Sequence, residues 1–411
     1  MTTTDKPIDP CSTPFGPQPQ DALQELLDKL EPVDSETLPW HAAAGRILAQ
    51  SVDSDRDSPP CDVSAMDGFA LRLSDIGTDP IDIADEVMIG RESPLLPPGK
   101  ALRIVTGGHV SPDVETIIIR EHVDEHDGKI TLSPEAVANA AQGRHIRRCG
   151  ENVKVGDNLF QPGIQITPAV QATLTSLGAP KPTVHRQVRV GIMVTGDEIH
   201  APEDTPEAWQ IRDSNGPTLR ALIDSVPWAQ VVEHRRIKDS LSELESAFKD
   251  LLTCCDVTFM SGGVSMGGRD FVPTMVERCG GKRVFHRIPV RPGKPLLAAV
   301  GPDGQAIMGL PGNPVSVLTT ARRFGVPVMA KRAGLADPLG RRTLVRVFES
   351  DGKTLPLWWY RQVKVDHDGR ATLLNTQGSG DYVSAAYSDG FIEIPPGSDS
   401  QGAWPFYAWT P

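Results

Sequence analysis

The sequence predicts a multidomain chain of α/β and β structure: a central, mostly parallel α/β sheet domain, an inserted β-rich domain and a small C-terminal β domain. Three observations support this prediction. The 411 residues exceed what a single hydrophobic core normally holds. Between residues 184 and 333, apolar runs typical of buried strands alternate with helical patterns. At 58–142 and at 334–411, short β-like runs alternate with turn residues.

The composition restricts the classes of function. With a formal net charge of −12, nonspecific binding to nucleic acid or to an anionic membrane is disfavoured, and a local basic site would instead select a discrete anionic ligand. Six cysteines without a Cys-x-x-Cys spacing argue against a zinc ribbon and against a disulfide scaffold. No apolar run reaches transmembrane length and the N-terminus is polar, so we expect a reducing cytoplasmic location.

The N-terminal part is predicted to be a scaffold interrupted by an insertion. Residues 1–20 are rich in Thr, Pro, Asp and Gln, which predicts a disordered tail. Asp21 is then expected to cap an amphipathic helix. Residues 21–57 and 143–183 contain strand and helix patterns without visible chemistry, and we expect them to form one discontinuous domain. The β-rich segment 58–142 is therefore predicted to be inserted into it.

Two loops of the predicted insertion contain polar residues suited to a ligand. Asp67 follows a proline-rich loop, but Asp67-Gly68 is also a common turn pair, so a purely structural role stays open. The β-like run 101–105 ends at Thr106, which two glycines follow. A hydroxyl beside glycines allows the backbone to approach a ligand closely.

Three predicted strands of the central domain end in polar or glycine-rich loops. The loops are Thr195–Glu198, Ser261–Asp270 and Gly309–Asn313, which follow or border the apolar runs Val188–Val194, Val257–Met260 and Ala306–Leu310. Because ligands of such sheets bind outside the carboxyl ends of the strands, we expect the loops to form one crevice. Asn313 and Pro314 are expected to begin a helix, with Asn313 as its N-cap.

Basic residues accompany these loops. Arg269, Arg291 and Lys294 lie in or between them, and backbone N–H groups at glycine-rich helix starts attract anions. Any one loop alone could be no more than a tight turn in an α/β sheet. Together they predict a site for phosphate or another oxyanion.

Taken in the order in which they occur along the chain, these sequence segments resemble the MoeA/gephyrin family, the molybdopterin molybdenumtransferases, over residues 22–400. The resemblance rests on the blocks Ser64–Ala70, Arg103–Gly107, Gly150–Asp157, Thr195–Glu198, Asp213–Asn215, Ser261–Asp270, Pro292–Pro295 and Gly309–Pro314. It implies that 184–333 is a MogA/MoaB-like molybdopterin-binding domain and that 334–411 is a small β-barrel. The family inserts molybdate into adenylylated molybdopterin with release of AMP, using a divalent metal such as Mg²⁺.

The resemblance also implies roles for individual residues. The implied catalytic set is Asp67, Thr106, Glu198, Asp239 and Asp270, of which Asp67, Glu198 and Asp270 are implied metal ligands. The implied substrate-binding set is Thr195, Gly196, Asp197, Ser261, Gly262, Gly263, Ser265, Arg291, Lys294, Pro311, Gly312, Asn313, Ser316, Arg361 and Ser379. Within it, Arg291, Lys294, Arg361 and Ser379 match positions that bind molybdate. Helix-start electrostatics alone would also explain Asp239, and Asp270 could be only an N-cap.

The sequence departs from the family pattern at three places. Arg291 stands where the family usually has lysine, and a planar guanidinium presents a different donor geometry. The loop after Thr106 lacks the usual proline and glycine pattern, and the C-terminal domain is short. These departures leave open a paralogue for tungstate or a modified pterin. Two competing hypotheses are a non-catalytic gephyrin-like scaffold and a nucleotide phosphohydrolase. The resemblance further implies a homodimer with its site between the sheet domain of one subunit and the Asp67 and Thr106 domain of the other, and possible contacts with an adenylyltransferase and apo-molybdoenzymes.

Overall fold

The computed structural model describes residues 16–77, 80–265 and 270–411. Its internal contacts divide the chain into two compact units. The first contains the described residues up to Gln50, then Pro162–Thr167 and Thr183–Pro411. The second contains Ser51–Gln161 and Pro168–Pro182. The finer division into the five segments expected from the sequence stays a prediction.

The first unit contains the expected α/β sheet. Its six strands follow the order β16-β13-β17-β21-β20-β18. The first four are parallel to one another, whereas β20 is antiparallel to both of its neighbours, β21 and β18. The strands are β13 (Val188–Thr195), β16 (Ala229–Ile237), β17 (Val257–Ser261), β18 (Lys282–His286), β20 (Leu297–Val300) and β21 (Ala306–Leu310). The prediction of a mostly parallel sheet with a late hairpin is thus confirmed.

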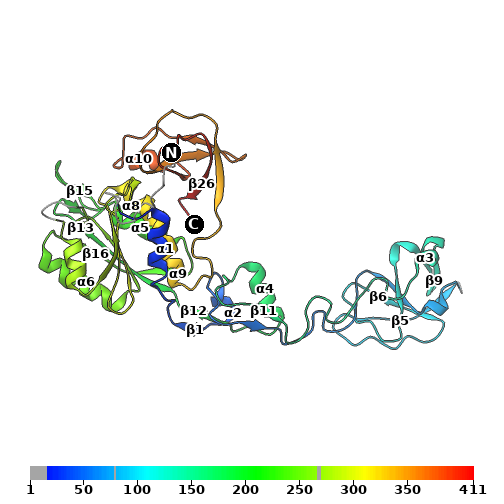
Figure 1. The fold of residues 1–411 in the computed structure, drawn as a ribbon. Helices are drawn as coiled ribbons and strands as arrows, with labels where there is room; N and C mark the ends of the chain where they lie inside the picture. The colour runs from blue at the N-terminus through cyan, green and yellow to red at the C-terminus, as the bar shows by residue number, and fades with distance from the viewer. Residues whose placement is uncertain (1–15, 78–79, 266–269) are drawn as a thin grey trace, which may run out of the picture. The chain divides into compact units, whose positions relative to one another are not determined.

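Helices cover both faces of this sheet (Figure 1). The helices of the first unit are α1 (Pro19–Leu27), α2 (Trp40–Ala43), α5 (Asn215–Asp224), α6 (Leu241–Cys254), α7 (Val272–Arg278), α8 (Pro314–Thr320), α9 (Val326–Arg332) and α10 (Tyr382–Ala386), with a π-helical turn at Ala321–Gly325. Alternate side chains of β13 lie on opposite faces of the sheet and belong to two different hydrophobic cores. Ile192 packs with α1, α5 and α9, whereas Met193 packs with α6 and α7.

A five-stranded barrel closes at the C-terminal end of the chain. Its strands are β22 (Thr343–Val347), β23 (Trp358–Val365), β24 (Arg370–Leu373), β25 (Gly390–Ile394) and β26 (Gly402–Ala408). Each strand pairs with two others, and the β23–β25 pairing closes the ring. The short strand β19 (Val290–Arg291) pairs with β23 from outside, and therefore ties a loop of the sheet domain to the barrel. The first unit also contains β1 (Ser35–Thr37), β12 (Thr183–His185), β14 (Ile199–His200) and β15 (Ile211–Arg212).

The second unit is built around a six-stranded sheet. The order is β7-β4-β6-β5-β9-β8, formed by β4 (Gly68–Leu71), β5 (Ile81–Glu86), β6 (Lys100–Ile104), β7 (Thr116–Ile119), β8 (Val123–His126) and β9 (Lys129–Leu132). Its other elements are β2 (Val52–Asp53), β3 (Val63–Ser64), β10 (Ile146–Arg147), β11 (Asn158–Phe160), the helices α3 (Pro134–Asn139) and α4 (Pro168–Ser176), and 3-10 turns at Leu73–Asp75 and Arg120–His122. The expected β-rich character of this part is confirmed.

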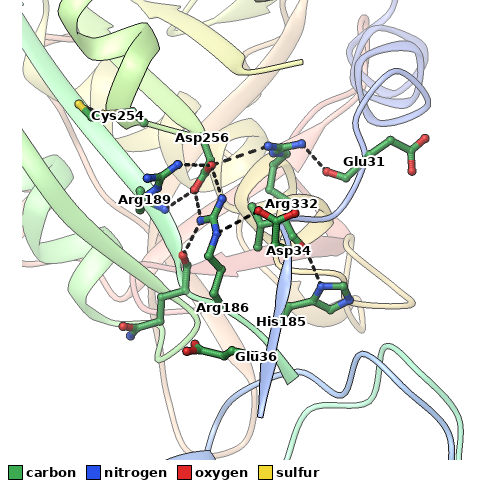
Figure 2. Close-up of polar contacts among 12 residues, drawn as sticks. Glu31, Asp34, Glu36, His185, Arg186, Arg189, Cys254, Asp256 and Arg332 are labelled. Carbon is green, nitrogen blue, oxygen red and sulfur yellow. Dashed lines mark hydrogen bonds and ion pairs between the residues drawn. The ribbon is translucent and has the colours of Figure 1, made fainter. Parts of the chain in front are cut away.

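A buried ion-pair cluster joins the N-terminal segment to the sheet (Figure 2). Asp256 is only 4% exposed and accepts two hydrogen bonds from Arg186, at 2.6 and 2.8 Å. Arg189 and Arg332 approach the same carboxylate at 3.4 and 3.9 Å. Burial alone would raise the pKa of Asp256, but the hydrogen bonds from Arg186 and Arg189 outweigh it and lower that pKa. The carboxylate of Asp256 therefore stays ionised beside the guanidinium groups.

Three helix starts differ from the sequence prediction. α1 begins at Pro19 with Gln18 as N-cap, so Asp21 lies in the first turn and is not the cap. Asn313 does occupy the N-cap position of α8, but its side chain makes no capping hydrogen bond. Ser240 and Glu243, whose spacing predicts a capping box, lie at the start of α6, but the Ser240 side chain makes no capping bond. At α6 and α8 the start of the helix fits the prediction, whereas the predicted cap side chains make no capping bond.

Candidate active site

The three predicted loops meet in a cavity at the carboxyl ends of β13, β17 and β21. We call this cavity of about 370 Å³ the acidic pocket. Its lining includes Thr195, Gly196, Glu198, Asp213, Asn215, Asp239, Ser261, Gly262, Gly263, Ser265, Asp270, Pro311, Gly312 and Asn313. The parallel register explains the convergence, because Thr195, Ser261 and Leu310 end adjacent strands. The crevice expected from the sequence therefore exists.

Hydrogen bonds hold the carboxylates of this pocket in place. The hydroxyl of Thr195 donates to Oδ1 of Asp239 at 2.5 Å. The backbone N–H of Asp239 in turn donates to Asp197 at 3.2 Å, which gives Asp197 a supporting position beside the pocket. Glycine is required at position 262, where φ is +98° and a Cβ atom would lie 2.4 Å from the carbonyl oxygen of Thr195.

Asn215 is a pocket residue whose role the sequence did not reveal. Its Nδ2 donates to Ser261 Oγ at 2.8 Å and to the carbonyl oxygen of Gly312 at 2.7 Å. Ser261 Oγ donates to the carbonyl oxygen of Pro311 at 3.3 Å. Asn215 therefore ties two of the three loops together. The Asp213–Asn215 block was the available signal, although the residue type alone predicts only a helix start.

The acidic side chains suit a divalent cation only when a bound substrate and water supply further oxygen donors. Glu198, Asp239 and Asp270 line the same pocket. Within the described part of the chain, however, no three His, Cys, Asp or Glu side chains are arranged to hold a metal ion. Mg²⁺ commonly binds through one or two carboxylates together with substrate phosphates and water. The oxygen donors of the pocket fit that mode of binding.

A second cavity adjoins the acidic pocket, and we call it the basic cavity. It has a volume of about 1190 Å³ and lies between the sheet domain and the barrel within the first unit. Its lining includes Arg291, Lys294, Ser316, Lys353, Trp359, Arg361 and Ser379. Of the described residues, five line both cavities: Ser265, Pro295, Pro311, Gly312 and Asn313. The two cavities therefore share a wall.

The predicted oxyanion ligands Arg291 and Lys294 reach the basic cavity from one loop. Arg291 lies on β19 opposite Trp359 of β23. Its side chain is exposed and has no hydrogen-bond or ion-pair partner among the described residues. Lys294 follows Gly293, whose φ of +113° and close approach to Thr320 require glycine. This turn directs the loop past the start of α8.

Ser379 is fastened to the start of α8 by two hydrogen bonds. Nδ2 of Asn313 donates to Ser379 Oγ at 2.8 Å, and the backbone N–H of Val315 donates to the Ser379 carbonyl at 3.1 Å. The Asn313 side chain thus links the helix start to the barrel. This contact explains why Asn313 does not cap α8.

Arg361 lies in the basic cavity but is already paired. Its two Nη atoms donate to the two carboxylate oxygens of Asp351 at 2.7 and 2.9 Å. Its guanidinium carbon lies 4.3 Å from the ring centroid of Trp359. The hydrogen bonds from Arg361 lower the pKa of Asp351 to about 2. Asp351 was not expected from the sequence, because ten residues separate it from Arg361 without a motif.

Asp67 and Thr106 contact each other in the second unit. Oδ1 of Asp67 accepts hydrogen bonds from the backbone N–H and from the hydroxyl of Thr106, both at 2.7 Å. The backbone bond and then the hydroxyl bond lower the pKa of Asp67, so its carboxylate stays ionised.

Arg269 lies outside the described residues. The structure thus groups the predicted residues into the two adjoining cavities and this pair.

Comparison with known proteins places the chain among proteins of one family. A family model for the MoeA N-terminal region (domains I and II) matches residues 18–178. A model for a probable molybdopterin-binding domain matches residues 191–331.

Individual relatives agree with these matches. A molybdopterin molybdenumtransferase of Haemophilus influenzae is 36% identical over 76% of this chain and 77% of its own. One from Synechococcus elongatus is 30% identical over 92% and 95%. The crystal structure of a molybdopterin biosynthesis MoeA protein from Pyrococcus horikoshii has a TM-score of 0.79 and 25% identity, with 95% and 99% of the two chains covered.

Proposed function

The chain belongs to the MoeA family of molybdopterin molybdenumtransferases, and on this basis we propose that it inserts molybdate into adenylylated molybdopterin and releases AMP. In this reaction two Mo–S bonds form at the dithiolene while an Mo–O bond of molybdate breaks, and that oxygen leaves as water with the two thiol protons. Water also attacks the phosphoanhydride, so that its bond to AMP breaks, AMP leaves and the other phosphate stays on molybdopterin. The observation that supports the proposal best is the shared wall between an acidic pocket and a basic cavity. A substrate that extends across this wall would have its phosphates and its sulfur atoms in different electrostatic surroundings.

The basic cavity is proposed to bind molybdate. A tetrahedral dianion needs fixed cations and hydroxyl or N–H donors around it. Arg291 and Lys294 provide positive charge from one loop, and Ser379 provides a hydroxyl that Asn313 holds in position. Arg361 provides a further guanidinium only in competition with the carboxylate of Asp351. In this part of the site Asp351 therefore neutralises Arg361, whereas the side chain of Arg291 has no ion-pair partner among the described residues.

The acidic pocket is proposed to bind the phosphoanhydride through a divalent cation. Glu198 and Asp270 would hold Mg²⁺ together with substrate oxygens. The metal-binding role expected for Asp67 stays a prediction. When bound, the cation neutralises the phosphoanhydride and assists its cleavage as a Lewis acid. Asp239 is held by Thr195 at a fixed position, which suits it to orient the attacking water. Gly262 and Gly263 keep the backbone open to the phosphates.

The experiment that tests this function is the release of AMP from adenylylated molybdopterin with Mg²⁺, with and without molybdate. We expect release that depends on molybdate and that yields active cofactor. A parallel series with tungstate separates a tungstate-specific paralogue from the molybdate enzyme. Release that is indifferent to both oxyanions would identify a phosphohydrolase, and no release at all would identify a scaffold.

Two further parts of the proposal need their own measurements. Omission of Mg²⁺ followed by titration with other divalent cations tests the metal requirement. Sedimentation equilibrium tests the predicted homodimer, which a monomer at micromolar concentration would contradict.

No helix in the described ranges is long and apolar enough to cross a bilayer.

A further inference from the structure

A third cavity lies away from both cavities of the candidate site. It has a volume of about 240 Å³ and lies where the π-helical turn after α8 meets the barrel. Its lining includes Gln20, Arg322, Arg323, Arg341, Arg342 and Tyr407. None of the described residues that line it also lines the acidic pocket or the basic cavity. We call it the arginine cavity.

One arginine of this cavity is fully paired. Arg323 is 4% exposed, and its Nε donates to both carboxylate oxygens of Glu393 at 3.2 and 3.1 Å. Its Nη2 donates to Gln20 at 3.2 Å, and the hydroxyl of Tyr407 donates to Glu393 at 2.8 Å. The negative charge of Glu393 is therefore used by Arg323, and it does not neutralise the other arginines.

Arg322 has no such partner. Its Nε donates to the carbonyl oxygen of Ala408 at 2.6 Å, and its guanidinium lies 5.8 Å from the ring centroid of Tyr407. Among the described residues no carboxylate pairs with it and its Nη groups have no hydrogen-bond partner. Burial lowers the pKa of Arg322, which reflects a cation removed from water without a counter-charge. A solvated surface arginine would not be held in this way.

Two more arginines add positive charge at the same cavity. Arg341 and Arg342 are exposed, and neither forms an ion pair with another described residue. Four guanidinium groups thus line the cavity of a chain whose net charge is −12, and among the described residues only that of Arg323 forms an ion pair, with Glu393. An acidic chain gains nothing in general solubility from such a local concentration of positive charge.

We infer that the arginine cavity is a binding site for a small phosphate-bearing anion, distinct from the site of the proposed reaction. The planar forks of Arg322 and Arg342 match the oxygen spacing of a phosphate group better than they match a spherical anion. The volume of about 240 Å³ lies below the usual range of roughly 300–1,000 Å³ for drug-sized ligands, which indicates a compact ligand. The ring of Tyr407 provides an apolar wall beside the guanidinium groups.

The test is calorimetric titration of the full-length protein with pyrophosphate and with inorganic phosphate at constant ionic strength. The Lys294→Met variant is titrated in parallel, because the basic cavity also attracts oxyanions. We expect this variant to retain one pyrophosphate site per chain. The double variant Arg341→Ser/Arg342→Ser, whose altered side chains are exposed, should weaken that site roughly tenfold or more for each guanidinium removed. Arg322→Met, which keeps the apolar stem, should weaken it to a similar degree.

A matched control removes the same charge elsewhere on the barrel. In Arg346→Ser/Arg370→Ser the two altered guanidinium groups lie over the ring of Phe348, at 5.8 and 5.7 Å from its centroid. We expect this variant to bind pyrophosphate as the wild type does. Equal losses in both double variants would reduce the effect to general electrostatics and overturn the inference. Loss of all binding in Lys294→Met would also overturn it, by assigning the anion to the basic cavity.

The proposed reaction supplies an independent measurement. Molybdate-dependent AMP release should be unchanged in Arg341→Ser/Arg342→Ser, because neither residue lines a cavity of the candidate site. The anion site and the reaction can therefore fail separately. Absence of pyrophosphate binding in an active wild-type enzyme would overturn the inference and leave the proposed function standing.

Discussion

The acidic pocket and the basic cavity share a wall but are built in different ways. The acidic pocket gathers residues that follow the carboxyl ends of adjacent parallel strands, so the sheet register fixes their positions. The basic cavity combines a loop before β20, the start of α8 and two segments of the barrel. Its members are positioned by individual contacts, such as Asn313 with Ser379 and Arg361 with Asp351. Sheet topology therefore positions the residues of the acidic pocket, whereas individual tertiary contacts position those of the basic cavity.

This difference assigns different tasks to the two cavities. Carboxylates at a sheet edge repel an oxyanion and attract a cation, whereas Arg291 and Lys294 do the opposite across the shared wall. Substitutions in the acidic pocket should therefore affect bond cleavage, and substitutions in the basic cavity should affect the concentration of molybdate that is needed.

The largest effect is expected for Glu198→Gln. The substitution keeps the shape of the side chain but removes the charge that would hold the cation, so AMP release should fall by roughly a hundredfold or more. The rate of AMP release at saturating molybdate is the measurement. Glu203→Gln is the matched control, because Glu203 is exposed on the next loop, after β14, and does not line the pocket. Wild-type rates in Glu198→Gln would remove this residue from the mechanism.

A smaller effect is expected for Lys294→Met. Loss of one charge-assisted bond to the oxyanion should raise the molybdate concentration for half-maximal AMP release roughly ten- to a hundredfold. The rate at saturation should change much less. Lys282→Met, an exposed position on β18, removes the same charge away from both cavities and should have no effect. A fall in the saturated rate without a change in molybdate dependence would contradict the division of tasks.

A still smaller effect, in the opposite direction, is expected for Asp351→Asn. The substitution releases Arg361 from its bidentate ion pair, while Trp359 continues to hold the guanidinium. Molybdate should then bind about three- to tenfold more tightly, because a competing negative charge is removed. Equilibrium binding of molybdate measures this change, with Asp366→Asn on the same barrel as control. Weaker binding would mean that Asp351 positions Arg361 and does not compete with the oxyanion.

Almost no effect on the reaction is expected for Asp256→Asn, although the protein should be destabilised by roughly 2–4 kcal/mol. The folded pKa of Asp256 lies below its ordinary value, so its stabilisation is complete above the unfolded pKa and is lost as the pH falls through the folded pKa. The difference in unfolding free energy between wild type and variant should therefore shrink below about pH 4. Urea unfolding followed by tryptophan fluorescence measures it. A pH-independent difference would show that charge is not its source.

The sequence predicted the backbone of the candidate site better than its side-chain contacts. The apolar runs and the loops after β13, β17 and β21 were sufficient to predict one crevice, because parallel strands bring their carboxyl ends to one edge. Asn313 and Ser240 were expected as helix caps, yet neither side chain makes a capping bond. Strands β8 and β26 were not predicted.

These differences share a physical cause. The partner of Asn313 is Ser379, 66 residues away, and the partner of Asp351, in the loop between β22 and β23, is Arg361 on β23. Local patterns determine where an element begins, whereas a polar side chain bonds to whichever donor or acceptor the tertiary fold brings near it. The catalytic and binding roles of the grouped residues stay predictions until they are measured.

The separation of tasks is tested most directly by titrating molybdate, in equilibrium binding, into Glu198→Gln and Lys294→Met side by side. The account predicts that Glu198→Gln binds molybdate with wild-type affinity although its AMP release is blocked, and that Lys294→Met binds it at least roughly tenfold more weakly. Equal loss of molybdate affinity in both variants would contradict the account, because the acidic pocket would then take part in binding the oxyanion.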